Sequence, residues 1–408
     1  MKRRCARAGR PLVLMIFAGS MLAGGAQADG RHYGKWKSGE VKRLNFNGQE
    51  FKADSNNETR LYLLENRVDG LEAGAADFSQ RGPRVAALKA SGGSVNAGGR
   101  YGPAKVDVDC AADESINAAI AGSDPSRPVT VKIAGNCAEN VYIRRHDVTI
   151  RGAGVDPSGA PLNQITGGIE IDASSRVSIV DLGVVNGRGT GVLVNNGSSV
   201  TLINLRVNGH ADTGVGVSKN SFAQIANVVV KNPREGNNAI FIDDGGNAQI
   251  RDSVFLSDSS VYGDGAALRL SRSGHARLEG DNLIQNTGRS ADFNAALAIQ
   301  VLHTSNLLVQ RGANRVVGNV FIASNSNVDL REAQLIGRAG VRSQSRLRLR
   351  NTSMLGDAKL SRGSMLQSDR ATIELGVDCS NSQSIVVNNR LAGSVGHGCT
   401  EEFPVPGF

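Results

Sequence analysis

Two adjacent carboxylates and two nearby arginines are the residues of this chain with the clearest capacity for chemistry. Asp243 and Asp244 follow the apolar stretch Ile240-Phe241-Ile242, and Arg269 and Arg272 accompany the next stretch of this kind. Paired carboxylates can share a proton between acid and base roles or bind Ca²⁺, and a neighbouring arginine can hold the carboxylate of a uronic acid. Asp243, Asp244 and Arg272 are therefore the candidate catalytic residues, and the two aspartates are the candidate Ca²⁺ ligands.

A second charged group lies near the C-terminal end. Residues 338–362 contain one acidic residue, Asp357, against seven basic ones: Arg338, Arg342, Arg346, Arg348, Arg350, Lys359 and Arg362. Strand alternation places the arginines of Arg346-Leu347-Arg348-Leu349-Arg350 on one face, where like charges repel unless an anion relieves them. Two interpretations stay open. The strip is either a solvated cap that blocks end-to-end stacking of coils or a docking site for an anionic polymer, such as an acidic exopolysaccharide or lipopolysaccharide.

The histidines give little support for catalysis. His210 and Asp212 lie in Gly-His-Ala-Asp, and we expect His210 and His275 to be isolated, solvent-exposed residues of turns. No Ser–His–Asp or Cys–His grouping can be assembled, and the histidines lack the spacing of metal ligands. The sequence therefore predicts no cofactor beyond the candidate Ca²⁺ site.

The candidate residues lie in a repeat of about 23 residues. The repeat is clearest at Ile169-Glu170-Ile171, Val192-Leu193-Val194 and Val215-Gly216-Val217. Looser copies follow at 240–242, 268–270, Leu297-Ala298-Ile299 and 320–322, and two further short apolar runs accompany most copies. Three short period-two strands per repeat cannot each bury a face alone, but stacked coils share one core. The pattern predicts an all-β fold, a right-handed parallel β-helix.

Register within such a solenoid brings distant residues together. Arg269 lies one coil after Phe241, so a cation lies beside an apolar ring. Phe241, Arg269 and Arg272 therefore form one candidate glycan-binding surface. The strip of Arg346, Arg348 and Arg350 is a second one. Lys219, Asp244 and Arg272 should also stack, since adjacent coils lie about 4.8 Å apart. A charge-compensated ladder is the structural alternative to a functional acid pair. We further expect a side-chain amide ladder at Asn186, Asn208, Asn232 and Asn286.

The first 28 residues have the pattern of a secretion signal: five basic residues, an apolar run from Pro11 to Leu22 and Ala26-Gln27-Ala28 before Asp29. Removing the five charges lowers the formal net charge from +8 to +3, so the high pI is no argument for nucleic-acid binding. No other stretch approaches the length of a membrane span. We therefore expect a secreted or periplasmic protein.

Four cysteines remain after this segment, and they lie at the two ends of the repeats. An even number in an exported chain predicts two disulfides, Cys110–Cys137 and Cys379–Cys399. End coils lack a neighbour on one side and therefore gain most from a covalent tie.

Residues 29–104 are not repetitive. Within them, residues 57–78 carry apolar residues at alternating spacings of three and four: Leu61, Leu64, Val68, Leu71, Ala75 and Phe78. This pattern predicts either a short coiled coil that can form a homo-oligomer or a single helix packed on the solenoid. We expect the β-helix over residues 105–400, a short helix from Asp113 to Ile120 with Asp113 as its N-cap, and a tail over 401–408.

One segment resembles a known family. Gly135-Asn136-Cys137-Ala138-Glu139, followed by Val148-Thr149-Ile150-Arg151-Gly152, is similar to the Gly-x-Tyr-x-Glu…Val-Thr-Ile-x-Gly opening of pectinesterase-like β-helices, with Cys137 in place of Tyr. Residues 105–400 thus resemble the pectin-lyase-like superfamily, which hosts lyases, hydrolases, esterases and epimerases as well as inert adhesins and tailspikes. The catalytic motifs of polygalacturonases, pectinesterases and alginate epimerases are missing, so no activity carries over.

The sequence therefore predicts an exported protein that binds, or modifies, an acidic extracellular or periplasmic polysaccharide. Two alternatives stay open. One is a polysaccharide lyase or epimerase acting on uronates, and the other is a non-enzymatic adhesin or tailspike-like module oligomerised through residues 57–78.

Overall fold

A computed structural model describes residues 41–46, 49–54, 102–156, 159–185, 187–232, 238–258, 265–288, 296–380, 384–389, 391–396 and 398–402. The chain divides into two compact units, residues 1–79 and 80–408. The first contains an antiparallel hairpin of β1 (Val41–Phe46) and β2 (Gln49–Asp54). The sequence analysis did not predict this hairpin, although the Asn-Gly dipeptide between the strands is a strong hairpin signal.

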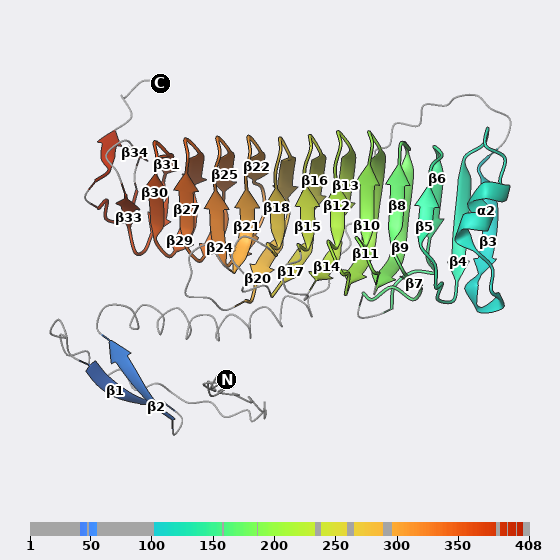
Figure 1. Cartoon of the computed structure of the whole chain (residues 1–408), viewed down its shortest axis with the longest axis horizontal. Coiled ribbons are helices and arrows are strands. Elements are labelled where there is room, and N and C mark those ends of the chain that lie inside the picture. Colours follow the sequence, from blue (N-terminus) through green and yellow to red (C-terminus); the bar gives the residue numbers. More distant parts are fainter. Residues whose placement is uncertain are drawn as a thin grey trace, which may run out of the picture. The chain divides into compact units, whose positions relative to one another are not determined.

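The second unit is a stack of coils whose strands pair in parallel (Figure 1). One strand of each coil joins the first ladder, an eleven-stranded sheet within the described part of the chain. Its strands are β5 (Val141–Ile143), β8 (Ile169–Asp172), β10 (Val192–Asn195), β12 (Val215–Val217), β15 (Ile240–Ile242), β18 (Leu268–Leu270), β21 (Leu297–Val301), β24 (Asn319–Ile322), β27 (Ala339–Arg342), β30 (Ala358–Ser361) and β33 (Val377–Cys379).

The second ladder carries the next strand of each coil. It consists of β3 (Ala104–Asp109), β4 (Val129–Ala134), β6 (Val148–Arg151), β9 (Val177–Val185), β11 (Ser199–Asn208), β13 (Phe222–Ala226), β16 (Asn247–Arg251), β19 (His275–Glu279), β22 (Asn306–Val309), β25 (Asn327–Arg331), β28 (Arg346–Arg350), β31 (Met365–Asp369), β34 (Ile385–Asn389) and β35 (Thr400–Glu402).

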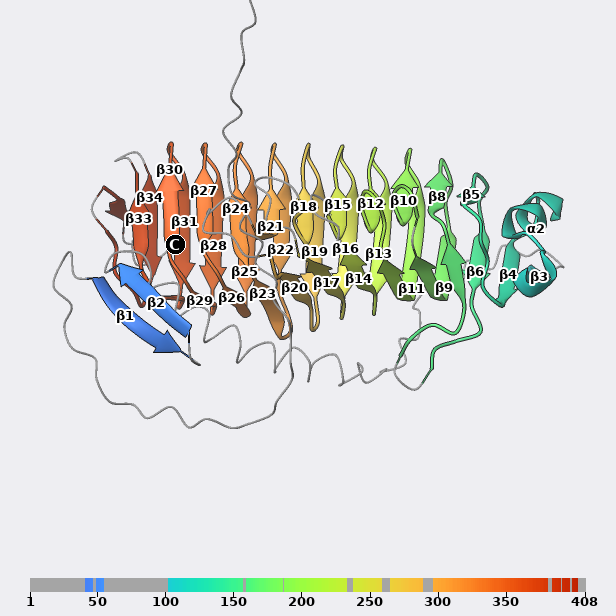
Figure 2. The ribbon, with the colours of Figure 1, turned by 60° about the horizontal axis from the view of Figure 1, so that its bottom comes forward.

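The third ladder lies along the lower edge of Figure 2. It contains β7 (Gln164–Thr166), the C-terminal halves of β9 and β11, and then β14 (Val229–Asn232), β17 (Val254–Ser257), β20 (Leu283–Asn286), β23 (Asn314–Val317), β26 (Ala333–Ile336), β29 (Ser353–Leu355) and β32 (Thr372–Ile373). Because β9 and β11 span both ladders, the second and third ladders form one continuous sheet. The predicted parallel β-helix is confirmed.

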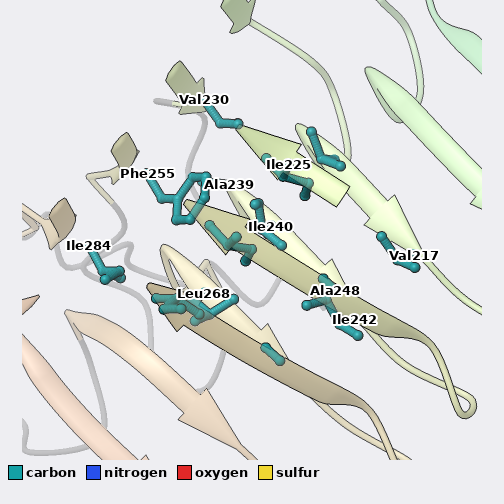
Figure 3. Packing of buried hydrophobic residues seen from close by; sticks show 14 of the residues in the cluster. Val217, Ile225, Val230, Ala239, Ile240, Ile242, Ala248, Phe255, Leu268 and Ile284 are labelled. Carbon is teal, nitrogen blue, oxygen red and sulfur yellow. The ribbon is translucent and has the colours of Figure 1, made fainter. Parts of the chain in front are cut away.

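The core lies between the three ladders. Alternate side chains of each strand point inward, so Ile240 and Ile242 of β15, Ala248 of β16 and Phe255 of β17 meet inside one coil (Figure 3). Phe255 is fully buried, and small residues offset its volume, since Ala248 has alanines in register in both neighbouring coils. Alanines thus stack on alanines from coil to coil, while Phe255 stacks between Val230 and Ile284, so that large and small columns lie side by side in the core.

The coils differ in length, and this shifts one predicted register. Successive first-ladder strands are offset by 23 residues at Ile169, Val192 and Val215, but Leu268 pairs with Ile299 rather than with Leu297. A bulge between Leu297 and Ile299 then places one extra residue of β21 against β24. The residue in register with Arg269 and Phe321 is therefore Gln300 and not Ala298, which corrects the predicted triplet, and Gln300 is 4% exposed.

The corner between the first and second ladders is held by stacked serines. Ser174 donates its backbone N–H to Ser198 Oγ over 3.1 Å, and Ser198 donates to Ser221 Oγ over 3.2 Å. Ser326 and Ser345 continue the same arrangement further along the stack, with a distance of 3.1 Å. Each buried hydroxyl satisfies a backbone donor of the preceding coil, which fixes this corner.

An amide ladder exists, but not where the sequence analysis placed it. Asn204 Nδ2 donates to Asp181 Oδ1 over 2.7 Å, and Asn227 Nδ2 donates to Asn204 Oδ1 over 2.6 Å. All three residues are left-handed, with φ between 53° and 57°, at the bend between the second and third ladders.

The predicted ladder positions are wrong where the structure describes them. Asn208 ends β11 without a left-handed φ, and Asn286 donates to the carbonyl of Leu297 over 3.0 Å. Asn186 and the side chain of Asn232 lie outside the described part. The bend that needs a left-handed residue is thus a different one from the bend predicted.

A short helix, α2 (Ile116–Gly122), covers the N-terminal end of the stack beside β3 and β4 (Figure 1). Its N-cap is Ser115, which corrects the predicted Asp113; Asp113 instead ends the 3-10 turn Cys110–Ala112 with φ 60°. Glu139 accepts hydrogen bonds from Ile116 N (2.6 Å) and Ser115 Oγ (2.9 Å). The glutamate of the family-like motif therefore holds the helix start and has a structural role.

The two predicted disulfides are present. Cys110–Cys137 ties the first described turn to the start of the coils, and Cys379–Cys399 ties β33 to the last strand, with Cα–Cα distances of 5.0 and 5.1 Å. Across the described ranges, no helix has the length and apolar character needed to cross a membrane.

Candidate functional surface

The acid pair lies at the corner after β15, and Arg272 from the next coil bridges it. Arg272 Nη2 pairs with Asp243 Oδ2, and Arg272 Nε lies 2.6 Å from Asp244 Oδ1. Asp244 and Arg272 both have left-handed backbones, with φ of 46° and 44°, because the chain turns sharply there from the first to the second ladder. The predicted stacking of Asp244 with Arg272 is confirmed as a geometric relationship.

The two carboxylates differ in environment. The Asp243 side chain is 7% exposed and that of Asp244 is 42% exposed. Burial raises the pKa of Asp243, and the nearby negative charge of Asp244 adds to this, while the hydrogen bond from Arg272 works against it. Asp243 is thus a buried carboxyl that protonates more readily than an ordinary aspartate, and Asp244 is the accessible member of the pair.

Phe241 and Arg269 lie beside this corner, on the outer face of the first ladder. They are in register on β15 and β18, and Arg269 Cζ is 5.2 Å from the centroid of the Phe241 ring. The outward position on the other side of Phe241 is Gly216, and the side chain of Leu193 extends over this glycine. Phe241, Arg269, Arg272, Asp243 and Asp244 therefore form one continuous surface, here called the Phe241 surface.

A second pair of the same kind lies further along the same row. Phe321 of β24 follows Phe241, Arg269 and Gln300 in register, and Arg342 Cζ is 5.4 Å from the Phe321 ring centroid. This pair was not predicted from the sequence, because Arg342 was counted with the basic cluster and not placed beside Phe321 of the triplet 320–322. The repeated Phe at the middle of a triplet was the available signal.

The basic cluster of residues 338–362 is divided by the fold. Arg338 binds the buried Asp357 through two nitrogens, at 2.6 and 3.0 Å, and Arg342 lies over Phe321. Burial by itself raises the pKa of Asp357, but the hydrogen bonds and charge of Arg338 outweigh it and lower that pKa overall. These two arginines therefore belong to the first-ladder face and not to the predicted strip.

The strip Arg346, Arg348 and Arg350 lies on the outer face of β28, as alternation predicts. Its register neighbours include Asp329 beside Arg348 and Asp369 beside Arg350, one coil before and one coil after. A count along the sequence misses these acids. The Nε atoms of Arg348 and Arg350 are nevertheless buried without a hydrogen-bond partner in the described part of the chain. Anion binding at this strip stays a prediction.

His210 differs from the prediction. It is fully buried, its Nδ1 accepts from Gly187 N over 3.2 Å, and its Nε2 lies 3.1 Å from Val184 O. The ring packs so closely that a Cβ on Gly187 would be 2.6 Å from Nδ1. His210 is thus a structural residue, because its ring contacts both β9, through Val184, and the segment that follows β9, through Gly187. His275 is exposed and in register with Asn247, as predicted, but it begins β19 instead of lying on a turn, and its Nδ1 lies 3.3 Å from Asn306 Nδ2.

Several predictions concern residues outside the described ranges. They include the secretion signal over 1–28, the coiled coil over 57–78 and most of the tail over 401–408. Within the described ranges, no three His, Cys, Asp or Glu side chains group as metal ligands. A Ca²⁺ ion at Asp243 and Asp244 would have to compete with the Arg272 guanidinium for both carboxylates.

A comparison with protein families matches residues 129–283 to the model described as right handed beta helix region. Among solved structures, the chain is similar to an ORF18 protein of Geobacillus virus E2, with 11% identity, a TM-score of 0.35, and coverage of 89% of this chain and 67% of that one. The A-module of a mannuronan C-5 epimerase from Azotobacter vinelandii shows 15% identity, a TM-score of 0.36, and coverage of 71% and 94%.

The tailspike protein gp49 from Pseudomonas phage LKA1 shows 12% identity and a TM-score of 0.32; the match covers 74% of this chain and 51%, about half, of the tailspike. A search of curated proteins finds no match. At these identities and TM-scores, none of the solved structures identifies an activity of this chain. The parallel ladders and the family match together identify it as a right-handed parallel β-helix protein.

Proposed function

We propose that this protein binds an acidic polysaccharide outside the cytoplasm, and that the Phe241 surface is its binding site. The observation that carries the proposal is the grouping of an aromatic ring with two arginines: Arg269 lies 5.2 Å from the Phe241 ring centroid, and Arg272 lies at the adjoining corner. The two disulfides support an oxidising compartment, secreted or periplasmic.

The chemistry of this surface suits a uronate. A sugar ring has an apolar face of C–H groups that packs on an aromatic ring, and its carboxylate needs charged hydrogen-bond donors. The planar guanidinium of arginine presents parallel N–H groups that match a carboxylate. Phe241 supplies the apolar platform, and Arg269 and Arg272 supply the donors.

The acid pair also prepares Arg272 for this role. Two of the three guanidinium nitrogens are engaged by Asp243 and Asp244, yet the Arg272 side chain is 59% exposed. The guanidinium is thus held in one orientation while part of it stays accessible to solvent. A fixed donor loses less conformational entropy on binding than a free side chain does.

Affinity measurements on a panel of polysaccharides test the proposal. Galacturonan, alginate and a neutral glucan would be compared by affinity electrophoresis, with the first two expected to retard the protein. The Arg269→Ala/Arg272→Ala variant should lose binding, with about 1–3 kcal/mol for each charged hydrogen bond. Arg176→Ala is the matched control, because it removes an exposed arginine that pairs with Asp147 at the same corner, four coils nearer the N-terminal end. Unchanged affinity in the double variant would remove this surface from consideration.

Catalysis on the same substrate is a second candidate, favoured by the environment of the acid pair. Asp243 has a raised pKa because it is buried, and it lies beside the more exposed Asp244 and beside Arg272. Carboxyls in unlike environments are suited to acid and base roles, and an arginine can neutralise the uronate carboxylate during β-elimination or epimerisation. Ultraviolet absorbance of the unsaturated lyase product, and NMR of the sugar ring for epimerisation, would detect these activities. Activity that survives Asp244→Asn would argue against this site.

A further inference from the structure

The outer face of the first ladder carries a second aromatic–arginine pair that repeats the chemistry of the Phe241 surface. Phe321 occupies the same outward row as Phe241, and Arg342 Cζ lies 5.4 Å from its ring centroid. In both pairs the arginine comes from the following coil, since Phe241 pairs with Arg269 and Phe321 pairs with Gly340, two residues before Arg342. The two pairs are built alike although they share no local sequence motif.

The spacing between the rings follows from the register. Phe241, Arg269, Gln300 and Phe321 are successive members of the row, so Phe321 lies three coils after Phe241. Adjacent strands are about 4.8 Å apart, which separates the two rings by roughly 14 Å along the solenoid axis. A disaccharide is too short to contact both rings, whereas a longer oligosaccharide that lies along the axis can do so.

The charges between and beyond the rings favour one direction for an anionic ligand that extends from Phe241. Arg269 lies between them and is partly exposed, Gln300 is the other residue between them but is only 4% exposed, and Lys359 follows Phe321 and Gly340 in the row. Before Phe241, in contrast, the row contains Leu193 and the acidic Glu170. An anionic chain anchored at Phe241 is therefore repelled towards the N-terminal end and attracted towards Phe321.

We infer that Phe321 and Arg342 form a second subsite for the same acidic polysaccharide, which lies along the solenoid axis from Phe241 towards the C-terminal coils. This inference rests on the proposed function, because it extends the Phe241 surface and names the length and direction of the ligand. Its distinguishing property is that the second subsite contributes only to the binding of long oligosaccharides.

Calorimetric titration with uronate oligosaccharides of two lengths tests the inference. The probes are disaccharides and octasaccharides of galacturonate and of mannuronate. The wild type should bind an octasaccharide at least about tenfold more tightly than the corresponding disaccharide, as expected for one additional arginine–carboxylate contact. Phe321→Ala/Arg342→Gln should remove this difference and leave disaccharide affinity unchanged, whereas Phe241→Ala/Arg269→Gln should weaken both lengths.

Tyr142→Ala is the matched control, since Tyr142 is a 50% exposed aromatic residue in the same row but at its N-terminal end. It should change neither affinity. Arg342→Gln alone provides a milder variant whose folding is verified by circular dichroism and melting temperature. Equal octasaccharide affinity in the wild type and the Phe321 and Arg342 variants would overturn the second subsite while leaving the proposed function intact. A wild type that binds no uronate of either length would overturn both.

Discussion

Arg272 lies one coil after Asp244, and its Nε atom is 2.6 Å from Asp244 Oδ1 although the residues are 28 positions apart in the chain. The contact exists because Ile242 and Leu270 are in register at the ends of β15 and β18, so that both strands turn at the same level. The same register brings Arg272 to Asp243. One arginine therefore bridges two acids, and the two contacts hold its guanidinium in place.

Asp244→Asn should destabilise the fold by no more than about 1 kcal/mol, because the Asp244 carboxylate is 42% exposed and solvent screens its pair with Arg272. Urea denaturation measures the change. Asp107→Asn on β3, an exposed position, is the control and should leave stability unchanged. A loss as large as that of a core substitution would show that the pair is a structural requirement of the corner.

Asp357→Asn should destabilise the protein by about 1–3 kcal/mol at neutral pH, since it breaks the two-point contact with Arg338. The pKa of Asp357 is lowered in the folded state, so its stabilisation is present above the unfolded pKa and is lost as pH falls through the folded pKa. Melting temperatures measured from neutral to acidic pH should therefore converge for wild type and variant. A difference that persists at the acid end would contradict the ionic origin.

Asp243 should show the opposite dependence of stability on pH to that of Asp357. Its pKa is raised by burial, so the stability linked to its protonation is present below the unfolded pKa and is lost as pH rises through the folded pKa. An asparagine cannot ionise, so the Asp243→Asn variant should not lose this stability. The melting temperature of the variant should therefore rise relative to that of the wild type as pH increases from the unfolded-state pKa to the folded-state pKa of Asp243. The opposite trend would show that the Arg272 contact dominates over burial.

His210→Ala should cost about 2–4 kcal/mol, because it empties a fully buried site and leaves the Gly187 N–H without its acceptor. The matched variant is His275→Ala, at an exposed position of β19, which should be within about 0.5 kcal/mol of the wild type. Chemical denaturation of both variants gives the comparison. Equal stabilities would mean that the turn at His210 is not part of the cooperative fold.

Removal of either disulfide should cost about 3 kcal/mol, as expected for loops with sequence separations of 27 and 20 residues. Peptide mapping without reduction should yield Cys110 joined to Cys137 and Cys379 joined to Cys399. The Cys→Ser pairs should melt at lower temperature than the wild type, starting from the end coil concerned. A crossed pair such as Cys110–Cys399 would contradict the connectivity.

Replacing Arg346, Arg348 and Arg350 with Gln should abolish retention on an acidic-polysaccharide or heparin column if the strip binds polyanions. The wild type should be retained at low salt and elute as rising ionic strength screens the contact, and the melting temperature of the triple variant should not fall. Arg144→Gln/Arg151→Gln/Arg176→Gln removes an equal charge from the N-terminal coils and serves as the control. Equal elution of wild type and triple variant would reduce the strip to an end cap.

The sequence by itself determined the solenoid. Triplets such as Val192-Leu193-Val194 recur at a constant spacing, and period-two alternation can bury its apolar face only by stacking coil on coil. It also determined the disulfides, because cysteines at the two ends of a one-dimensional stack have partners only nearby. Both inferences depend on local spacing, which the sequence contains completely.

The tertiary structure decided which residues meet across coils. Leu268 pairs with Ile299 instead of Leu297, which places Gln300 two residues beyond the predicted Ala298, and no local signal predicts how a long coil absorbs its extra residues. Burial of His210 likewise depends on the path of a turn, and the acids beside Arg348 and Arg350 come from neighbouring coils. Such contacts depend on register between segments about twenty to thirty residues apart, and register is fixed only when the whole core packs.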